Sequence, residues 1–361
     1  IAPLAAAAGV RVALLTGRDK GAERARLLAD LAAGRIGILL GTHAVFQKGV
    51  EFHDLRLAVI DEQHRFGVAQ RMELGAKGQA VDILVMTATP IPRSLALAQY
   101  GDMDISVLDE KPPGRQPVTT ALVSAGRMDE VVARLARAVA EGRRAYWVCP
   151  LVEESEAVDL TAATERFKAL RARLGEGVVA LVHGQMPGPE KDAAMADFAA
   201  GRVQVLVATT VIEVGVDVPE ATIMVIEGAE HFGLAQLHQL RGRVGRGAGA
   251  STCLLMYAPP LGEAARQRLE LLRESDDGFR IAEADLAMRG AGDVLGVAQS
   301  GLPRFRIADL ERQAGLMALA QSDARALLAT DPALEGPRGQ AARVLLWLME
   351  RDKAIRLIGV G

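Results

Sequence analysis

The sequence is poor in the residues that mark secreted, membrane-spanning or disulfide-stabilised proteins. It has only two cysteines, Cys149 and Cys253, and both lie in apolar runs, which favours buried thiols over a disulfide or a metal site. No apolar run approaches the ~18 residues of a membrane-spanning helix, and the N-terminus lacks the basic and then apolar segments of a secretory signal. We therefore expect a cytoplasmic protein that does not enter a membrane.

An excess of charge of one sign is also missing. The chain has 42 basic and 45 acidic side chains, which give a formal net charge of −3. This balance excludes a global positive field that would attract nucleic acid or an anionic membrane, so any nucleic-acid site has to be local. Half of the 361 residues are apolar, which is enough for the cores of about two domains and excludes disorder as the main state.

The phosphate-binding loop Gly-x-x-x-x-Gly-Lys-Ser/Thr is absent. The chain contains only seven lysines, and none of them is followed by serine or threonine. If the protein hydrolyses a nucleoside triphosphate, this loop has to lie upstream of Ile1. The first residues have the pattern of a helix already under way and no initial methionine. We therefore expect the chain to be a fragment of a longer protein.

Short apolar runs alternate with helical patterns along most of the chain, which is typical of an α/β fold with parallel sheets. In the first part, strands are expected at 10–15, 37–40, 57–60 and 83–86, and a helix at 24–33. In the second part, strands are expected at 119–123, 146–152, 178–183, 203–209, 222–227 and 252–257. The helices between them are expected at 128–140, 157–174, 189–199 and 234–240.

These patterns predict three regions, with a linker between the first and the second. Residues 111–118 are rich in proline and have no apolar periodicity, which is typical of a linker. Residues 1–110 then form a first α/β domain and residues 119–262 a second of similar size. Strand patterns stop after residue 262, so 263–361 is expected to be a helical appendage.

Two adjacent carboxylates follow an apolar strand. Asp61 and Glu62 come directly after the strand, and Gln63 and His64 come next. Ligands bind at this edge of an open parallel sheet, where one carboxylate can hold Mg²⁺ and its neighbour can polarise a water for attack on a phosphoryl group. A solvated Asp-Glu turn is also compatible with the pattern. A metal hydrolase that uses both carboxylates with His43 and His64 is a further alternative.

Two further strand exits carry polar residues. Thr87 and Thr89 follow one strand just before a proline, and these hydroxyls are suited to bridging the carboxylates to a moving part. Gly215 and Asp217 lie on a loop that follows another strand. An ordinary Thr-Pro strand end and a turn aspartate are the simpler interpretations of these two patterns.

A short arginine-rich loop follows the last helix of the second domain. Arg241, Arg243 and Arg246 are separated by glycines, and Gln239 precedes them. Glycines allow close approach to a partner, and planar guanidinium groups bind phosphate oxygens in pairs. The loop therefore predicts a phosphate site, with a solvated basic loop as the alternative.

Taken in order, these segments resemble superfamily 2 helicases, whose motor consists of two RecA-like domains with ATP between them. Residues 41–47, 61–67, 87–93, 211–219 and 236–247 resemble the RecG family of ATP-dependent branched-DNA helicases. Segments between 277 and 301 resemble the translocation motif that this family shares with transcription-repair coupling factors. In that motif a helical hairpin converts motor closure into a push on duplex DNA. Gln63, where coupling factors usually have glutamate, favours the RecG family.

The resemblance implies a role for each candidate residue. Asp61 would hold Mg²⁺ through water, and Glu62 would activate the attacking water. His64 would complete the catalytic set. The second domain would contribute the residues that approach ATP, the last two as arginine fingers: Gly215, Asp217, Gln239, Arg243 and Arg246. Another group would couple hydrolysis to DNA movement: Gln63, His64, Thr87, Thr89, Arg289 and Gln299.

The implied function is remodelling of branched DNA, such as stalled forks and Holliday junctions, in recombination and repair. ATP and Mg²⁺ are the implied cofactors, and branched double-stranded DNA and single-stranded DNA-binding protein are the implied partners. Because the phosphate loop and the family's upstream wedge domain are missing, this chain alone is expected to be inactive. A coupling-factor-like translocase acting on RNA polymerase and a non-catalytic remnant that binds branched DNA are the alternatives.

Overall fold

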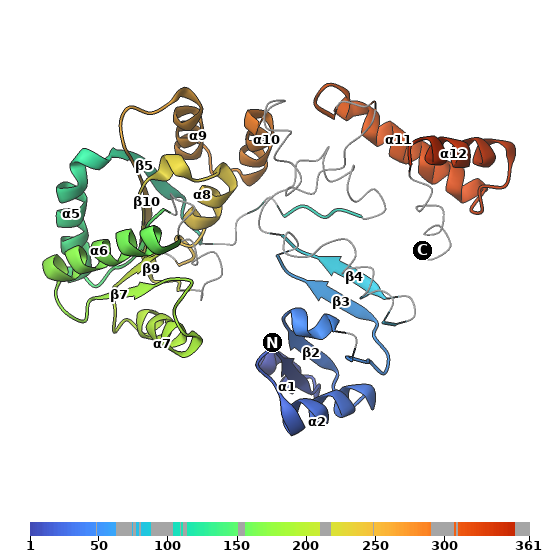
Figure 1. Cartoon of the computed structure of the whole chain (residues 1–361), viewed down its shortest axis with the longest axis horizontal. Coiled ribbons are helices and arrows are strands. Elements are labelled where there is room, and N and C mark those ends of the chain that lie inside the picture. The colour runs from blue at the N-terminus through green and yellow to red at the C-terminus, as the bar shows by residue number, and fades with distance from the viewer. Residues whose placement is uncertain are drawn as a thin grey trace. The chain divides into compact units, whose positions relative to one another are not determined.

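The chain divides into two compact units, Ile1–Ala88 and Thr89–Gly361 (Figure 1). The computed structural model describes residues 1–47, 49–62, 74, 77–78, 81–87, 104–108, 110, 114–150, 156–209, 218–247, 249–289, 307 and 310–350. Within these ranges, no helix has the length and apolar character to cross a membrane.

The first unit contains two pairs of parallel strands. Strand β1 (Val12–Leu15) pairs with β2 (Ile38–Gly41), and β3 (Leu57–Ile60) pairs with β4 (Asp82–Val85). Helix α1 (Ala2–Ala7) precedes β1, α2 (Gly21–Ala32) connects β1 to β2, and the short helix η1 (His43–Phe46) follows β2. A small core forms around Leu15, Leu31 and Ile36, where α2 packs against its strands.

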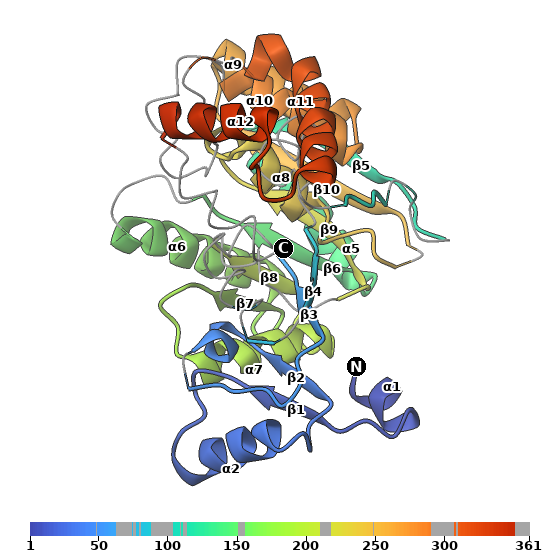
Figure 2. The ribbon, with the colours of Figure 1, turned by 90° about the vertical axis from the view of Figure 1, so that its right-hand side faces the viewer.

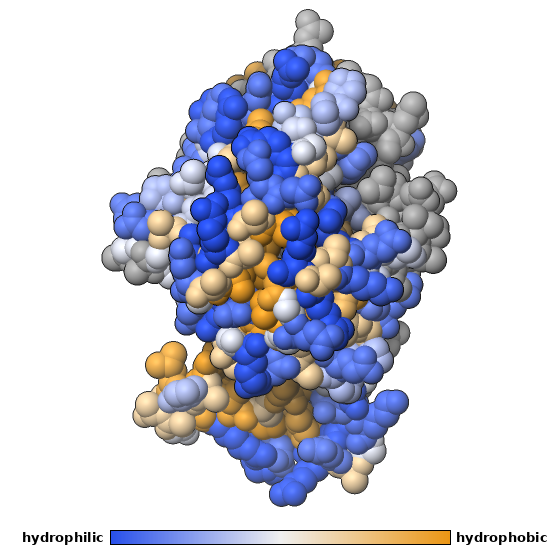
Figure 3. Space-filling view, turned by 90° about the vertical axis from the view of Figure 1, so that its left-hand side faces the viewer, coloured by the Kyte–Doolittle hydropathy of each residue, from blue (hydrophilic) through white to orange (hydrophobic). Residues whose placement is uncertain are grey.

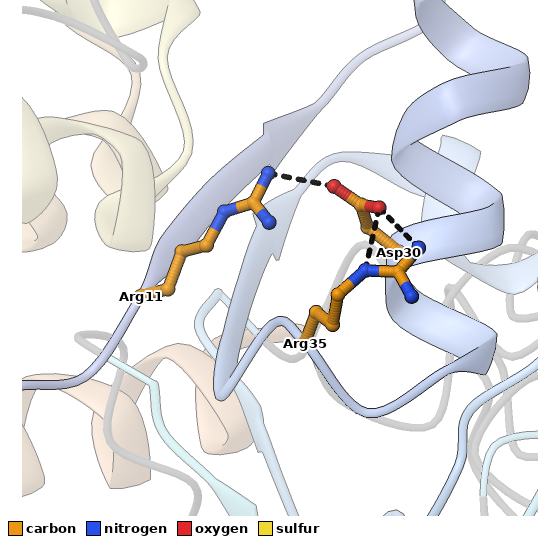
Figure 4. Close-up of polar contacts among 3 residues, drawn as sticks. All are labelled: Arg11, Asp30 and Arg35. Atoms are coloured by element: carbon orange, nitrogen blue, oxygen red, sulfur yellow. Dashed lines mark hydrogen bonds and ion pairs between the residues drawn. The ribbon is translucent and has the colours of Figure 1, made fainter.

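An ionic network joins α2 to the amino ends of β1 and β2 (Figure 4). Asp30, on α2, accepts hydrogen bonds from Arg11 Nη2 at 2.8 Å and from Arg35 Nη2 at 2.6 Å. The hydrogen bonds from Arg35, followed by those from Arg11, lower the pKa of Asp30. Arg11 directly precedes β1, and Arg35 lies just before β2, so this network holds the amino edge of the β1–β2 pair. The polar strand exits at Asp61 and Thr87 belong to the separate β3–β4 pair.

The second unit is built on a six-stranded parallel sheet with the order β5-β10-β9-β6-β8-β7. Its strands are β5 (Val118–Ser124), β6 (Arg144–Val148), β7 (Val179–Val182), β8 (Val205–Ala208), β9 (Ala221–Ile226) and β10 (Ser251–Tyr257). The connecting helices are η3 (Ala125–Arg127), α5 (Met128–Ala140), α6 (Glu156–Leu174), α7 (Gly188–Ala199), η5 (Ala229–His231) and α8 (Leu234–Arg241). Helices α9 (Glu263–Glu274) and α10 (Gly278–Arg289) follow the last strand.

Alternate side chains of these strands enter two separate cores. Trp147 of β6 packs with α5 and α6 on one face of the sheet. Its neighbour Tyr146 packs with α7, α8 and α9 on the other face, together with Ile281 of α10. Because both faces are covered, the strands consist almost entirely of apolar residues, which is why they could be recognised in the sequence.

After α10, the described part of the chain is mainly helical, as predicted. Helices α11 (Leu310–Thr330) and α12 (Pro337–Leu348) follow each other in the chain (Figure 2). In the turn between them, Asp331 accepts the amide hydrogens of Glu335 and Gly336. Several large apolar side chains of these two helices are exposed, including Leu319 and Trp347. Hydrophobic residues are also visible between hydrophilic ones on the face drawn in Figure 3.

The predicted strands and helices are confirmed with small shifts at their ends. The largest difference is at 146–152, where β6 begins at Arg144 and ends at Val148. Pro150 follows two residues later and has no backbone N–H to donate, so it cannot continue the ladder.

Candidate functional site

The carboxylate pair and Thr87 lie at one edge of neighbouring parallel strands. Ile60 of β3 is in register with Val85 of β4, and the amide of Met86 donates to the carbonyl of Ile60 at 2.8 Å. Asp61 and Glu62 therefore leave β3 beside the point where Met86 and Thr87 leave β4. The structure brings these three predicted residues to the same carboxyl edge, where open parallel sheets bind ligands.

Glu62 has a backbone conformation that is unusual for a residue with a side chain. Its φ is +54°, in the left-handed region, which costs on the order of 1 kcal/mol. Its amide donates to Asp61 Oδ1 at 2.8 Å, which orients the carboxylate of Asp61. The sharp turn ends the strand and leaves Asp61 exposed and Glu62 half-buried. Gln63, His64 and Thr89 lie outside the described residues.

An exposed carboxylate beside a half-buried one fits a Mg²⁺ ion that keeps most of its water. Mg²⁺ in phosphoryl-transfer sites is usually held by one or two carboxylates and by substrate phosphates. In the part of the chain that the structure describes, no three histidine, cysteine or carboxylate side chains come together as metal ligands. The alternative of a metal hydrolase also needs His64, which lies outside the described residues, so it stays a prediction.

Helix α8 and the loop after it hold the second group of candidate residues. Leu234, Leu237 and Leu240 are buried on one side of α8, which leaves Gln239 half-buried. The amide of Arg243 donates to the carbonyl of Leu240 at 3.0 Å, so the loop continues directly from the last turn of the helix.

The loop is anchored between its arginines. Val244 is fully buried, whereas Arg243 is half-buried and Arg246 exposed. Gly245 has a φ of +76°, and a Cβ atom there would lie 2.7 Å from Cγ2 of Val118, so this position requires glycine. A fixed backbone that presents Arg243 and Arg246 on either side of a buried valine is suited to phosphate recognition.

Arg241 is not presented by the loop together with Arg243 and Arg246, which corrects the grouping of three arginines made from the sequence. It is only 4% exposed, and its Nη1 donates to the carbonyls of Leu272 at 2.5 Å and Ser275 at 2.8 Å. Both carbonyls lie at the C-terminal end of α9, where a cation is favoured by the helix dipole and by carbonyls without helical partners. Arg241 therefore has a structural contact in place of a ligand contact.

We expect His238, beside Arg241, to make the stability of the second unit sensitive to acid. Burial, followed by the charge of Arg241, lowers the pKa of His238 to about 4, and its Nδ1 lies 3.0 Å from Arg241 Nη2. An unfolded histidine titrates near about 6.5, so below that pH the unfolded chain binds more protons and the folded state loses stability until about pH 4. The loss is at most about 3 kcal/mol.

Denaturant unfolding of the wild type and His238→Gln between pH 7 and pH 4 tests this expectation. The free energy of unfolding should fall less steeply with acid for His238→Gln. If the free energy of unfolding falls equally steeply with acid in both proteins, His238 is not the group responsible.

One charged cluster at the carboxyl edge of the large sheet was missed in the sequence. Glu227, directly after β9, accepts hydrogen bonds from Trp147 Nε1 and from Arg166 Nε and Nη2. The guanidinium carbon of Arg166 also lies 5.7 Å from the centre of the Trp147 ring. Burial and the charge of Glu227 raise the pKa of the nearby Cys149 to about 12. A carboxylate directly after an apolar strand, the signal that identified Asp61, would have identified Glu227 as well.

The remaining candidates are only partly placed. Gly215 and Asp217 lie outside the described residues, between the buried Thr209 and the buried Val218. Arg289 is the last residue of α10, and Gln299 lies outside the described residues.

Three family models match successive parts of the chain. The DEAD/DEAH box helicase model matches residues 2–97, and the helicase conserved C-terminal domain matches residues 128–248. The model described as ATP-dependent DNA helicase RecG, domain 3, C-terminal, matches residues 275–356. The ATP-dependent DNA helicase RecG of Escherichia coli (strain K12) is 48% identical over 352 residues, or 96% of this chain. The chain belongs to the RecG family.

Other RecG proteins match over similar lengths. RecG of Acidithiobacillus ferridurans is 50% identical over 324 residues, covering 90% of this chain and 47% of that protein. RecG of Bacillus subtilis is 49% identical over 323 residues, covering 89% of this chain and 47% of that protein. The match to the Escherichia coli protein covers 50% of its length. The chain thus spans about half the length of these RecG relatives.

Solved structures support the predicted α/β architecture. The structure of RecG bound to a three-way DNA junction is 45% identical, has a TM-score of 0.65, and covers 85% of this chain and 40% of that chain. The DUF1998 helicase MrfA bound to DNA and AMPPNP is 14% identical with a TM-score of 0.56 over 83% of this chain and 48% of that chain, which shows the fold alone. With the family matches, these structures confirm two RecA-like regions with parallel sheets and a helical C-terminal domain.

Proposed function

We propose that this chain is the motor part of an ATP-dependent DNA helicase or translocase that remodels branched DNA in recombination and repair. The observation that carries the proposal is the 45% identity to a RecG whose solved structure holds a three-way DNA junction, over 85% of this chain. The match of residues 275–356 to a RecG-specific domain favours this function over that of a transcription-repair coupling factor. The protein would work in the cytoplasm, with single-stranded DNA-binding protein as a further partner.

The proposed chemistry is ATP hydrolysis at the carboxyl edge of the first unit. A Mg²⁺ ion bound there would neutralise charge on the phosphates of ATP. Asp61 would orient the water shell of this ion, and Glu62 would accept a proton from the attacking water. Arg243 and Arg246 would stabilise the charge that develops on the phosphate oxygens, and Gln239 would contact the same nucleotide.

Further residues would complete the nucleotide site or connect ATP hydrolysis to DNA. Gly215 and Asp217 are proposed to approach the nucleotide from the second domain. A second group is proposed to couple hydrolysis to movement along DNA, and within it His64 also belongs to the catalytic set: Gln63, His64, Thr87, Thr89, Arg289 and Gln299.

The proposed domain bounds are 1–110 and 119–262 for the two motor domains, with 111–118 as linker and 263–361 as the translocation and C-terminal region. DNA contacts are expected mainly at phosphates, so binding should weaken with salt.

The proposal is tested with the complete gene product that contains this chain. A synthetic three-way junction is expected to stimulate ATP hydrolysis in the presence of Mg²⁺, and ATP is expected to drive separation of the junction strands. The 361-residue chain alone is expected to do neither, because it has no Gly-x-x-x-x-Gly-Lys-Ser/Thr loop. Junction binding that is indifferent to ATP, with no phosphate release by the complete protein, would instead support a non-catalytic DNA-binding role.

A further inference from the structure

Arg241 connects the end of α8 to the beginning of α10 through continuous hydrogen bonds. Its Nη1 contacts the carbonyls of Leu272 and Ser275 at the end of α9. Ser275 Oγ in turn accepts the amide hydrogen of Asp277 at 3.2 Å. Asp277 Oδ1 then accepts the amide hydrogen of Phe279, in the first turn of α10, at 2.9 Å. A displacement of Arg241 would therefore reach the start of α10.

The same residue is joined to the loop that presents Arg243 and Arg246. The amide of Val244 donates to the carbonyl of Arg241 at 3.2 Å. Arg246 Nε donates to the carbonyl of Gly242, the residue after Arg241, at 3.3 Å. Movement of the loop toward a phosphate would thus involve the last turn of α8.

Burial makes the part of this connection between Arg241 and the end of α9 stiff, whereas Asp277, which links it to α10, is exposed. Arg241 is 4% exposed, Leu272 is fully buried and Ser275 is 8% exposed. If the guanidinium left its two carbonyls, a buried cation and two buried acceptors would lose their partners, which is strongly unfavourable. Moving α9 and the start of α10 together with the loop keeps these hydrogen bonds intact.

We propose that Arg241 is a positioning residue that transmits movement of the loop with Arg243 and Arg246 to α10. ATP binding and release at the loop then shift the start of the appended helices. This inference rests on the proposed function, since it requires nucleotide phosphates at Arg243 and Arg246. Arg241 itself contacts no nucleotide.

Arg144 provides a matched control within the same unit. Its Nη1 donates to the carbonyls of Phe198 at 3.3 Å and Ala199 at 2.8 Å, at the end of α7, and its side chain is 17% exposed. Arg144 therefore caps a helix with the same chemistry as Arg241. It lies at the amino end of β6, at the edge of the sheet opposite the strand exits.

The experiment compares Arg241→Lys with Arg144→Lys in the complete protein. Junction-stimulated ATP hydrolysis and strand separation are measured together, and hydrogen exchange of α10 amides is measured with and without Mg²⁺ and a non-hydrolysable ATP analogue. For Arg241→Lys we expect a KM for ATP within about twofold of the wild type and about tenfold less strand separation per ATP hydrolysed. Nucleotide should change exchange in α10 of the wild type and of Arg144→Lys, but not of Arg241→Lys.

Hydrolysis and strand separation that fall in equal proportion in both variants would overturn the inference. If Arg241→Lys does not fold, hydrogen exchange of the wild type still tests the inference. Nucleotide that protects residues 242–247 without changing exchange in α10 overturns this inference but not the proposed function. A wild-type protein that releases no phosphate overturns the proposed function, and this inference with it.

Discussion

In the complete protein, Glu62→Gln is expected to bind ATP and branched DNA but to release phosphate about 10³-fold more slowly than the wild type. The amide has the shape of the carboxylate, so the half-buried position after β3 is filled equally well. It cannot accept the proton of the attacking water at neutral pH. The left-handed backbone at residue 62 costs the same for both side chains, so the two proteins should unfold at the same temperature.

Phosphate release at saturating ATP and junction DNA, with separate measurements of nucleotide and DNA binding, checks this result. Glu51→Gln is a suitable control, since Glu51 is an exposed glutamate of the same unit. That variant should match the wild type. Phosphate release at the wild-type rate by Glu62→Gln would show that another group activates the water.

Arg246→Ala is expected to lower the rate of ATP hydrolysis by about 10³-fold with little effect on stability. Arg246 is exposed, and its contact with the carbonyl of Gly242 is a long one of 3.3 Å. Its removal therefore leaves the fold of the loop to Val244 and Gly245, which are buried. The loss should fall on kcat more than on KM, because an arginine finger acts on charge that develops in the transition state.

Steady-state kinetics over a range of ATP concentrations, together with thermal unfolding, separates these effects. Arg202→Ala is the control, because Arg202 is an exposed arginine paired with Asp197 at 2.5 Å. It should leave both kcat and Tm unchanged. If Arg246→Ala keeps its kcat and instead lowers the salt dependence of junction binding, the loop contacts DNA phosphates and not ATP.

Much of the fold was predictable because buried parallel strands and the helices that cover them have distinctive local patterns. The helix expected at 128–140 is α5 (Met128–Ala140), and the strand expected at 57–60 is β3 (Leu57–Ile60). The edge on which Asp61 and Thr87 meet could also be anticipated, since parallel strands end on the same side of a sheet. Such features depend on neighbours along the chain or on strand direction alone.

The roles of individual charged residues were less predictable because their partners are distant in sequence. Arg241 stands two residues from Arg243, yet its acceptors are 31 and 34 residues away, on the end of α9. Glu227 contacts Trp147 and Arg166, which are 80 and 61 residues away. No periodicity or spacing in the sequence encodes these pairs.

The local sequence was therefore sufficient for the strands, the helices, the carboxylate pair and the arginine-rich loop. Packing was needed to show that Arg241 is buried as a helix cap while Arg246 is exposed, and that Glu227 belongs to an ionic cluster. The physical reason is that hydrophobic patterning acts over a few residues, whereas the burial and pairing of a charge depend on which elements meet in the folded chain.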